Sequence, residues 1–272
     1  MNLIWISDPH LDRAGPAAVE RFLGALRARA AEAVILTGDL SNSSRIIDDL
    51  ELLCAAAGAP IYHVLGNHDH YGSSVGKVRD AIIGLAERSP SIQWLPPAGV
   101  IRFSDGTALV GVDGWADGRF GDPLHTPLTL NDDRMIEEVA AQADRTGKLI
   151  VKRALADADA RRLETLLERA VADGSPRIIV ATHVPPFVEA LAPRSRESHP
   201  HWHPLLVCGA TGGVLRDFAA RHPDLPVTVL AGHSHREHEA TIQPNLEVRV
   251  AGARYGAPDV IPVGEGHRSA RD

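Results

Sequence analysis

Five short segments of the sequence carry side chains of the types that bind divalent metal ions. They combine aspartate, histidine and asparagine, in three cases beside glycine: Asp8-Pro9-His10, Gly38-Asp39, Gly66-Asn67-His68-Asp69, Thr182-His183 and Gly232-His233-Ser234-His235. Carboxylate, imidazole and amide oxygen together suit Mn, Fe or Zn better than metals that prefer sulfur. Glycine lets the backbone pass close to an ion. The residue types therefore predict a divalent metal site, provided that the fold brings the segments together.

Each segment alone has a plainer interpretation. An Asp-x-His sequence is common in helix caps and surface turns, Gly-Asp is common in ordinary turns, and a single His183 fits a hydrogen-bonded core histidine. What favours the metal site is that all five segments follow predicted strands. The carboxyl ends of neighbouring strands meet at one edge of an open α/β sheet, where ligand sites form.

The elements that position these residues follow from the hydrophobic periodicity. In the first seventy residues short apolar runs alternate with helical spacing, which predicts strands over 3–7, 33–37 and 61–65 and helices over 16–30 and 43–57. Such alternation indicates a sheet with helices on its faces. Later patterns predict helices over 73–87 and 154–172 and strands near Trp94 and over 100–103, 107–112, 177–181, 227–231 and 246–251. Residues 113–150 and 184–212 remain as two excursions near the expected site.

Length and composition limit the function further. The chain has 272 residues, 44% of them apolar, which favours one domain over residues 1–272. The net charge of −7 gives no overall basic field, so a nucleic-acid partner is not expected. No apolar run approaches the ~18 residues of a membrane span, so no membrane association is expected. The two cysteines, and an N-terminus without a basic leader, favour the cytoplasm, and residues 264–272 are expected to fray.

In this order, the five segments resemble the signature of the calcineurin-like metallophosphoesterase superfamily. The resemblance spans residues 8–235 and implies a four-layer α/β/β/α sandwich, with two mixed sheets flanked by helices and the site on loops at one edge. It also implies two divalent metal ions, with Asp39 bridging them. Asp8, His10 and His235 would hold one ion and Asn67, His183 and His233 the other. The chain departs from the family pattern at Asn42, where many members have aspartate in Gly-Asp-x-x-Asp, and this affects a supporting contact rather than a ligand.

The same resemblance implies a mechanism and two further roles. Two divalent ions about 3.5 to 4 Å apart lower the pKa of a bridging water, so that a hydroxide attacks phosphorus while both ions hold its oxygens. His68 would face the substrate and either stabilise the phosphoryl oxygens or protonate the leaving group. Asp69 would orient His68, as carboxylates commonly orient imidazoles. A purely structural His68 is the alternative.

The segment Ser198-His199-Pro200-His201-Trp202-His203-Pro204 is the most unusual feature outside the signature. The histidines of this segment, with Trp202, are candidates for lining the substrate pocket, because the loop follows His183, and the nearby Arg194 and Arg196 are candidates for binding a phosphate. Of these, His201, His203 and Arg194 are the expected substrate-binding residues. A solvated loop, or binding of an adventitious metal, is the alternative. Residues 113–122 are a weaker candidate for the opposite wall of the pocket.

The sequence thus predicts a metal-dependent hydrolase of a small-molecule or phosphorylated substrate. Phosphodiesterase and phosphomonoesterase activity both fit, with a slight preference for a diester that rests on the resemblance alone. A nuclease of the same superfamily is one alternative, although no basic stripe is present. A non-catalytic metal-binding scaffold for a protein partner is the other, although all seven ligand positions and His68 are present.

Overall fold

Two mixed β-sheets packed face to face form the centre of the protein. The computed structural model describes residues 2–263, so the fraying expected at 264–272 lies outside the described residues. The first sheet has the order β11-β1-β2-β3-β4, with parallel strands β1 (Leu3–Ile6), β2 (Ala33–Thr37), β3 (Ile61–Val64) and β4 (Ile92–Trp94), and β11 (Ile261–Val263) antiparallel at the edge.

The second sheet has the order β5-β6-β7-β8-β10-β9. Its four central strands are parallel and its two edge strands are antiparallel to their neighbours. The strands are β5 (Ile101–Arg102), β6 (Ala108–Gly111), β7 (Ile178–Ala181), β8 (Val227–Ala231), β9 (His238–Gln243) and β10 (Leu246–Val250).

The apolar strands are buried on both faces, and successive side chains point to opposite sides of the sheet. In β1, Leu3 and Trp5 join the core between the two sheets, whereas Ile4 and Ile6 pack toward the helices. In β7, Ile179 and Ala181 face the first sheet in the same way.

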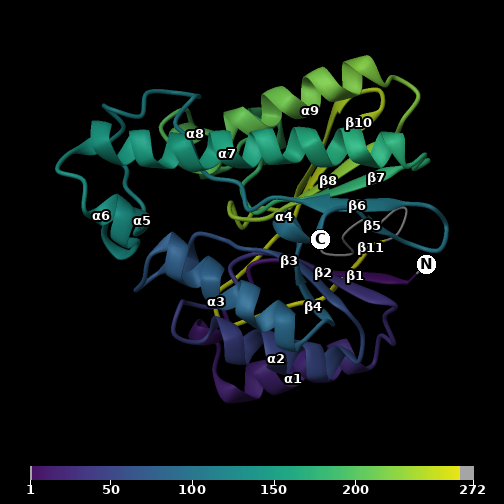
Figure 1. Cartoon of the computed structure of the whole chain (residues 1–272). Coiled ribbons are helices and arrows are strands. Elements are labelled where there is room, and N and C mark those ends of the chain that lie inside the picture. The colour runs from purple at the N-terminus through teal and green to yellow at the C-terminus, as the bar shows by residue number, and fades with distance from the viewer. Residues whose placement is uncertain (1, 264–272) are drawn as a thin grey trace.

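Helices cover the outer face of each sheet, which confirms the expected four-layer sandwich (Figure 1). The first sheet is covered by α1 (Pro16–Arg27), α2 (Ile46–Ala57) and α3 (Val75–Arg88), and the second by α7 (Arg145–Ala172) and α9 (Gly209–Arg221). The short helices are α4 (Leu95–Ala98), α5 (Asp132–Met135), α6 (Glu137–Ala140) and α8 (His203–Leu206), and short 3-10 turns cover Leu11–Arg13, His68–His70, Val188–Ala190 and Arg196–Ser198. No helix among the described residues has the length and apolar character needed to span a bilayer.

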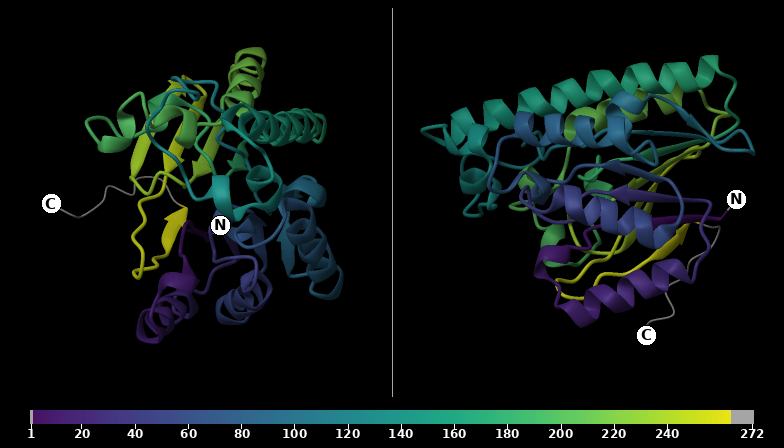
Figure 2. Two further views of the ribbon diagram at one scale, coloured as in Figure 1. Left: turned by 90° about the vertical axis from the view of Figure 1, so that its left-hand side faces the viewer. Right: turned by 60° about the horizontal axis from the view of Figure 1, so that its bottom comes forward.

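The structure differs from the sequence-based expectation in the start of one helix and in several elements that were not predicted. α7 begins at Arg145, nine residues before the expected start, because the Asp144 side chain caps it by accepting a hydrogen bond from the Gly147 amide. Its first turns extend past the sheet and pack on α6 instead (Figures 1 and 2). Helix α9 and the edge strands β9 and β11 were not predicted, and β9 is only partly buried, so its sequence has no clear apolar run.

Candidate metal centre

The first cluster of potential ligands consists of Asp8, His10, Asp39 and His235. Asp8 and His10 follow β1, Asp39 follows β2 and His235 follows β8. One nitrogen or carboxylate oxygen from each residue lies within 4.8 Å of all the others. Within this cluster His10 Nε2 lies 3.1 Å from His235 Nε2 and 3.7 Å from Asp39 Oδ2, and His235 Nε2 lies 3.2 Å from Asp8 Oδ1. The structure therefore brings together four of the seven predicted ligands.

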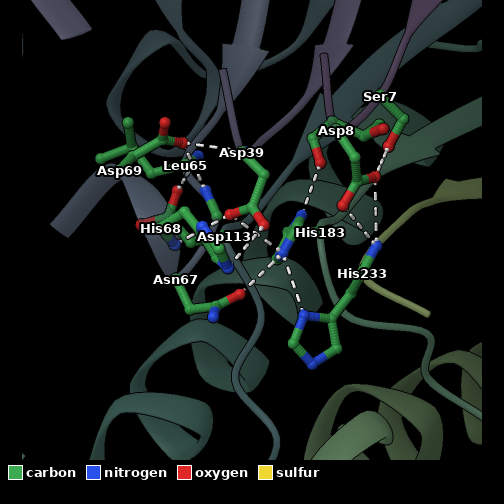
Figure 3. Close-up of polar contacts among 12 residues, drawn as sticks. Ser7, Asp8, Asp39, Leu65, Asn67, His68, Asp69, Asp113, His183 and His233 are labelled. Carbon is green, nitrogen blue, oxygen red and sulfur yellow. Dashed lines mark hydrogen bonds and ion pairs between the residues drawn. The ribbon is translucent and has the colours of Figure 1, made fainter. Parts of the chain in front are cut away.

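The second cluster surrounds His183, with Asn67 on one side and His233 on the other (Figure 3). His183 Nε2 lies 3.0 Å from Asn67 Oδ1, 3.2 Å from His233 Nδ1 and 3.3 Å from Asp39 Oδ1. Asp39 thus directs one oxygen toward each cluster. All seven predicted ligand side chains converge at the carboxyl ends of the strands, from both sheets.

Hydrogen bonds to carbonyl groups fix the tautomers of two imidazoles. His183 Nδ1 donates to the Thr37 carbonyl at 2.8 Å and His233 Nε2 donates to the Leu205 carbonyl at 2.9 Å, since a carbonyl oxygen only accepts. The opposite nitrogens, His183 Nε2 and His233 Nδ1, are left with lone pairs that face each other across 3.2 Å. A carbonyl behind the ring is the usual support of a metal-binding histidine, so this donor set fits a divalent ion.

The charges of the site also fit bound cations. Burial lowers the pKa of His10 to about 2 and that of His233 to about 4, so both rings are neutral and can bind metal near pH 7. Burial, followed by the nearby charges of Asp8 and Asp69, raises the pKa of Asp39 well above its ordinary value. Two buried carboxylates close together are unfavourable in their charged form unless a cation neutralises them.

The backbone at the predicted ligands adopts a rare conformation. Seven non-glycine residues among the described part of the chain have positive φ, and five of them are predicted ligands: Asp8, His10, Asp39, His233 and His235, with φ between 43° and 65°. This left-handed conformation is unfavourable for residues with a Cβ and concentrates at functional sites. Here it turns the chain sharply after each strand, which directs the side chains into one volume.

The two residues predicted to act in catalysis have different surroundings. The His68 ring lies beside the first cluster, with its Nε2 3.9 Å from Asp39 Oδ2, and its backbone amide donates to Asp39 Oδ1 at 2.9 Å. The Asp69 carboxylate accepts hydrogen bonds from the backbone amides of Gly66, Asp39 and Ser41 at 2.8, 3.0 and 3.1 Å. No described hydrogen bond joins Asp69 to His68. Instead of orienting His68, the Asp69 carboxylate connects the turn after β3 to the turn after β2.

Two supporting residues were not found by sequence reasoning. The Asn67 side-chain amide donates to Tyr71 Oη at 2.9 Å and to Asp132 Oδ1 at 2.7 Å. Tyr71 Oη in turn donates to Asp132 Oδ1 at 2.6 Å. Tyr71 lies four residues after Asn67, which is a weak local signal. Asp132 lies in the aperiodic excursion, and nothing in the sequence connects it to Asn67.

A cavity of about 470 Å³ opens over the two clusters. The loop 184–212 contributes to its wall. Of the residues expected there, Arg196 and Trp202 line the cavity, together with Glu197, whereas Arg194, His201 and His203 do not. His203 Nε2 instead donates to the Ser198 carbonyl at 3.0 Å, and His201 is exposed. The wall predicted at 113–122 is also wrong, because none of these residues lines the cavity. Leu130 and Asn131 line it instead, and so do Arg254 and Tyr255 from beyond β10.

Comparisons with known proteins identify the family and the fold. A family model described as calcineurin-like phosphoesterase matches residues 1–237. Among solved structures, the phosphopantetheinyl hydrolase of Mycobacterium tuberculosis is 15% identical with a TM-score of 0.66, covering 100% of this chain and 98% of that one. A dimetal phosphatase from Danio rerio is 13% identical with a TM-score of 0.59, covering 93% and 87%. At these identities the structures show a shared fold only, and no curated protein sequence matches the chain.

Proposed function

Because the chain belongs to the calcineurin-like phosphoesterase family and is a hydrolase of phosphoester bonds, we propose that it cleaves a small or medium-sized phosphoester with two divalent ions. The observation that supports this most directly is the position of Asp39. Its two oxygens face two separate clusters of nitrogen and oxygen donors, as a bridging ligand requires. Asp8, His10 and His235 would hold one ion, and Asn67, His183 and His233 the other.

The chemistry is hydrolysis at phosphorus. Two divalent ions, when bound, supply a nucleophile from water at neutral pH and neutralise charge on the phosphoryl group. The oxygen of water forms the new bond to phosphorus, the ester P–O bond breaks, and the leaving oxygen takes up a proton. Mn, Fe and Zn fit the mixed donor set, and phosphodiesters and phosphomonoesters are both within the proposal.

We propose that His68 stabilises the phosphoryl oxygens by donating a hydrogen bond. Burial lowers the pKa of His68 to about 4, so the ring is neutral near pH 7 and has an N–H to donate. Of the two roles expected for His68, this favours hydrogen bonding over proton transfer from an imidazolium. Asp69 would act on Asp39 and Gly66 through their backbone amides instead of through His68.

The two alternatives lead to different outcomes in one experiment. A nuclease of the same superfamily would cleave single-stranded or double-stranded DNA, and a scaffold would bind metal without turnover.

The free thiols of Cys54 and Cys208 fit the cytoplasmic location expected from the sequence, which stays a prediction.

The test is hydrolysis by metal-stripped protein that is reloaded separately with Mn, Fe(II), Zn or Mg. Chromogenic monoesters and diesters and a DNA substrate are assayed, and bound metal is counted in the same samples. Activity that rises until about two ions are bound per chain is expected, and the preferred ester identifies the subclass. Two bound ions without cleavage of any ester would contradict the proposal.

A further inference from the structure

The orientation of the Asn67 amide is fixed by groups outside the two clusters. A side-chain amide has one NH₂ group and one oxygen, so holding the NH₂ group also aims the oxygen. Both donor bonds of the NH₂ are made, to Tyr71 Oη and to Asp132 Oδ1, and the oxygen is left 3.0 Å from His183 Nε2. Since Tyr71 Oη also donates to Asp132 Oδ1, this one carboxylate oxygen accepts hydrogen bonds from both the Asn67 amide and the Tyr71 hydroxyl.

Asp132 is itself held firmly. It is only 3% exposed, and the ammonium group of Lys152 on α7 lies 3.9 Å from its other oxygen. Lys152 also pairs with Asp133 at 2.7 Å. The neighbours Leu130 and Asn131 line the cavity, so the segment that holds Asn67 is also part of the substrate wall.

We propose that Asp132, acting with Tyr71, is a positioning residue that sets the affinity of the second metal position through Asn67. The inference rests on the two-metal site of the proposed function. Hydrogen-bonded supports of metal ligands typically change metal affinity by about 10-fold to 100-fold when they are removed. The effect should be confined to the Asn67 cluster, because neither Asp132 nor Tyr71 has a described hydrogen bond to Asp8, His10 or His235.

The test is calorimetric titration of metal-stripped protein with Zn or Mn alone, without any substrate. In Asp132→Ala and Tyr71→Phe one of the two binding events should lose about 10-fold to 100-fold in affinity, and the other should not change. Asp132→Asn keeps an oxygen acceptor and should restore most of the affinity. Asp133→Ala is the matched control, because Asp133 also pairs with Lys152 but has no described contact with Asn67.

The outcomes separate this inference from the proposed function. Unchanged affinities in both variants, or an equal loss at both positions, would overturn the role of Asp132 alone. A parent protein that binds a single ion would overturn the two-metal site of the proposed function, and this inference with it. If Asp132→Ala does not fold, Tyr71→Phe decides the test, because it removes only one hydroxyl. Hydrolysis is not measured in the titration, so absence of turnover would count against the proposed function alone.

A second observation concerns the rim of the cavity, which is cationic although the chain carries a net charge of −7. Arg196, Arg236 and Arg254 line the cavity, where the carboxylates are the expected metal ligand Asp39 and Glu197. Glu197 lies 3.3 Å from Arg196 and 3.2 Å from Arg236. Arg254 forms no ion pair with any carboxylate in residues 2–263. It lies beyond residue 237, where the family match ends, and beside Tyr255, whose ring is 4.5 Å from that of His10.

We infer that Arg254, together with Arg236, binds a second anionic group of the substrate, separate from the phosphoester that is cleaved. This inference also rests on the proposed function and specifies its substrate class: an organic phosphoester with another phosphate or carboxylate. Guanidinium groups bind both anions through paired hydrogen bonds. Trp202, Leu206 and Leu130 also line the cavity and offer an apolar surface for the organic part.

The test compares substrates that share the cleaved ester and differ by one phosphate. The probes are adenosine 5′-phosphate against adenosine 3′,5′-bisphosphate, and the p-nitrophenyl ester of thymidine 5′-phosphate with and without a 3′-phosphate. The parent should show a KM at least about tenfold lower for the member with the extra phosphate. Arg254→Gln should abolish this difference, whereas Arg216→Gln should keep it, because Arg216 on α9 pairs with Glu189 and does not line the cavity.

A parent that does not distinguish the members of a pair would overturn the subsite. If Arg254→Gln raised the KM equally for both members of a pair, Arg254 would act at the cleaved ester instead. If no ester is hydrolysed, the proposed function fails, and calorimetric binding of the same two adenosine phosphates then decides the inference.

Discussion

At the scale of single residues, the site consists of donors that cannot satisfy one another. The facing nitrogens of His183 and His233 both carry lone pairs, and Asp39 is buried close to Asp8. Such an arrangement is unfavourable unless a cation lies among the donors. The same reasoning makes Asp39 the residue whose change should have the widest effect, because it serves both clusters.

Asp39→Asn should therefore reduce bound metal from two ions to one or fewer and abolish hydrolysis. The amide keeps the shape of the carboxylate but removes the charge that would bridge the two ions. Metal counting after dialysis, together with the ester assay, checks this. Two retained ions with full activity would show that Asp39 does not bridge.

His68→Ala should keep both ions and lose mainly rate, by about 10² to 10³-fold in kcat, as expected when one hydrogen-bond donor to a developing charge is removed. His68 lies beside the first cluster but is not among its four ligands. Metal content and kcat are measured on the same preparation, with His125→Ala, an exposed histidine, as the control. Parent-like hydrolysis by His68→Ala would make the ring merely structural.

At the scale of elements, the turns after the strands determine the site, and glycine is required where they touch. A Cβ at Gly232 would overlap Asp8 Oδ2 and Ser7 Oγ, and a Cβ at Gly66 would overlap Asp39 Oδ1. These glycines let the turn after β8 approach β1, and the turn after β3 approach β2. The Gly-His-Ser-His and Gly-Asn-His-Asp motifs are therefore constrained by packing between turns as well as by the ligands.

Gly232→Ala should displace the Asp8 carboxylate and weaken metal binding in the first cluster by at least about tenfold, the range seen when the geometry around a metal ligand is disturbed. Gly213→Ala is the matched control, since a Cβ there meets nothing within 4 Å and alanine favours its helix, α9. Titration with Zn and the midpoint of urea unfolding are compared for both variants. Unchanged affinity in Gly232→Ala would mean that Asp8 is not a ligand.

At the scale of the whole molecule, the two sheets share one interior. Leu3, Trp5 and Ile35 of the first sheet pack against Leu109 and Ile179 of the second. Each sheet contributes ligands from its strand ends, so the site exists only when the sheets are packed together. For this reason we propose that the chain folds as one domain.

The buried His63 should make stability depend on pH. Burial lowers its pKa from 6.5 to about 4, and neither ring nitrogen has a hydrogen-bond partner among the described residues. Above pH 6.5 the ring is neutral in both the folded and the unfolded chain. Below it the unfolded chain binds a proton that the folded chain excludes, so stability is lost between pH 6.5 and about 4.

His63→Leu should remove this loss. On going from pH 7.5 down to pH 5, the free energy of unfolding of His63→Leu minus that of the parent should increase by about 2 kcal/mol, because only the parent loses this stability. Urea unfolding of metal-free protein at the two pH values measures the difference, with His125→Leu at the surface as the control. A constant difference between His63→Leu and the parent at both pH values would show that His63 titrates normally.

The local sequence determined the strands, the polar turns that follow them and the ligand types. These signals depend on neighbouring residues alone: apolar runs specify strands, and Asp, His and Asn beside glycine mark the turns. These signals identify the five polar segments, and the family resemblance selected from them the seven expected ligands, which are Asp8, His10, Asp39, Asn67, His183, His233 and His235. The family resemblance added the layer order.

Only the tertiary structure decided which side chains support the ligands and which ones face the substrate. Asp132 lies 65 residues from its hydrogen-bond partner Asn67. Arg254 and Glu197 line the same cavity although they are 57 residues apart in the sequence. Hydrophobic periodicity cannot predict contacts at such separations. Asp69 accepts hydrogen bonds from backbone amides, and the histidines of the 198–204 loop do not line the cavity. Such contacts depend on how two sheets and their loops pack, and packing is set by the whole chain rather than by any segment of it.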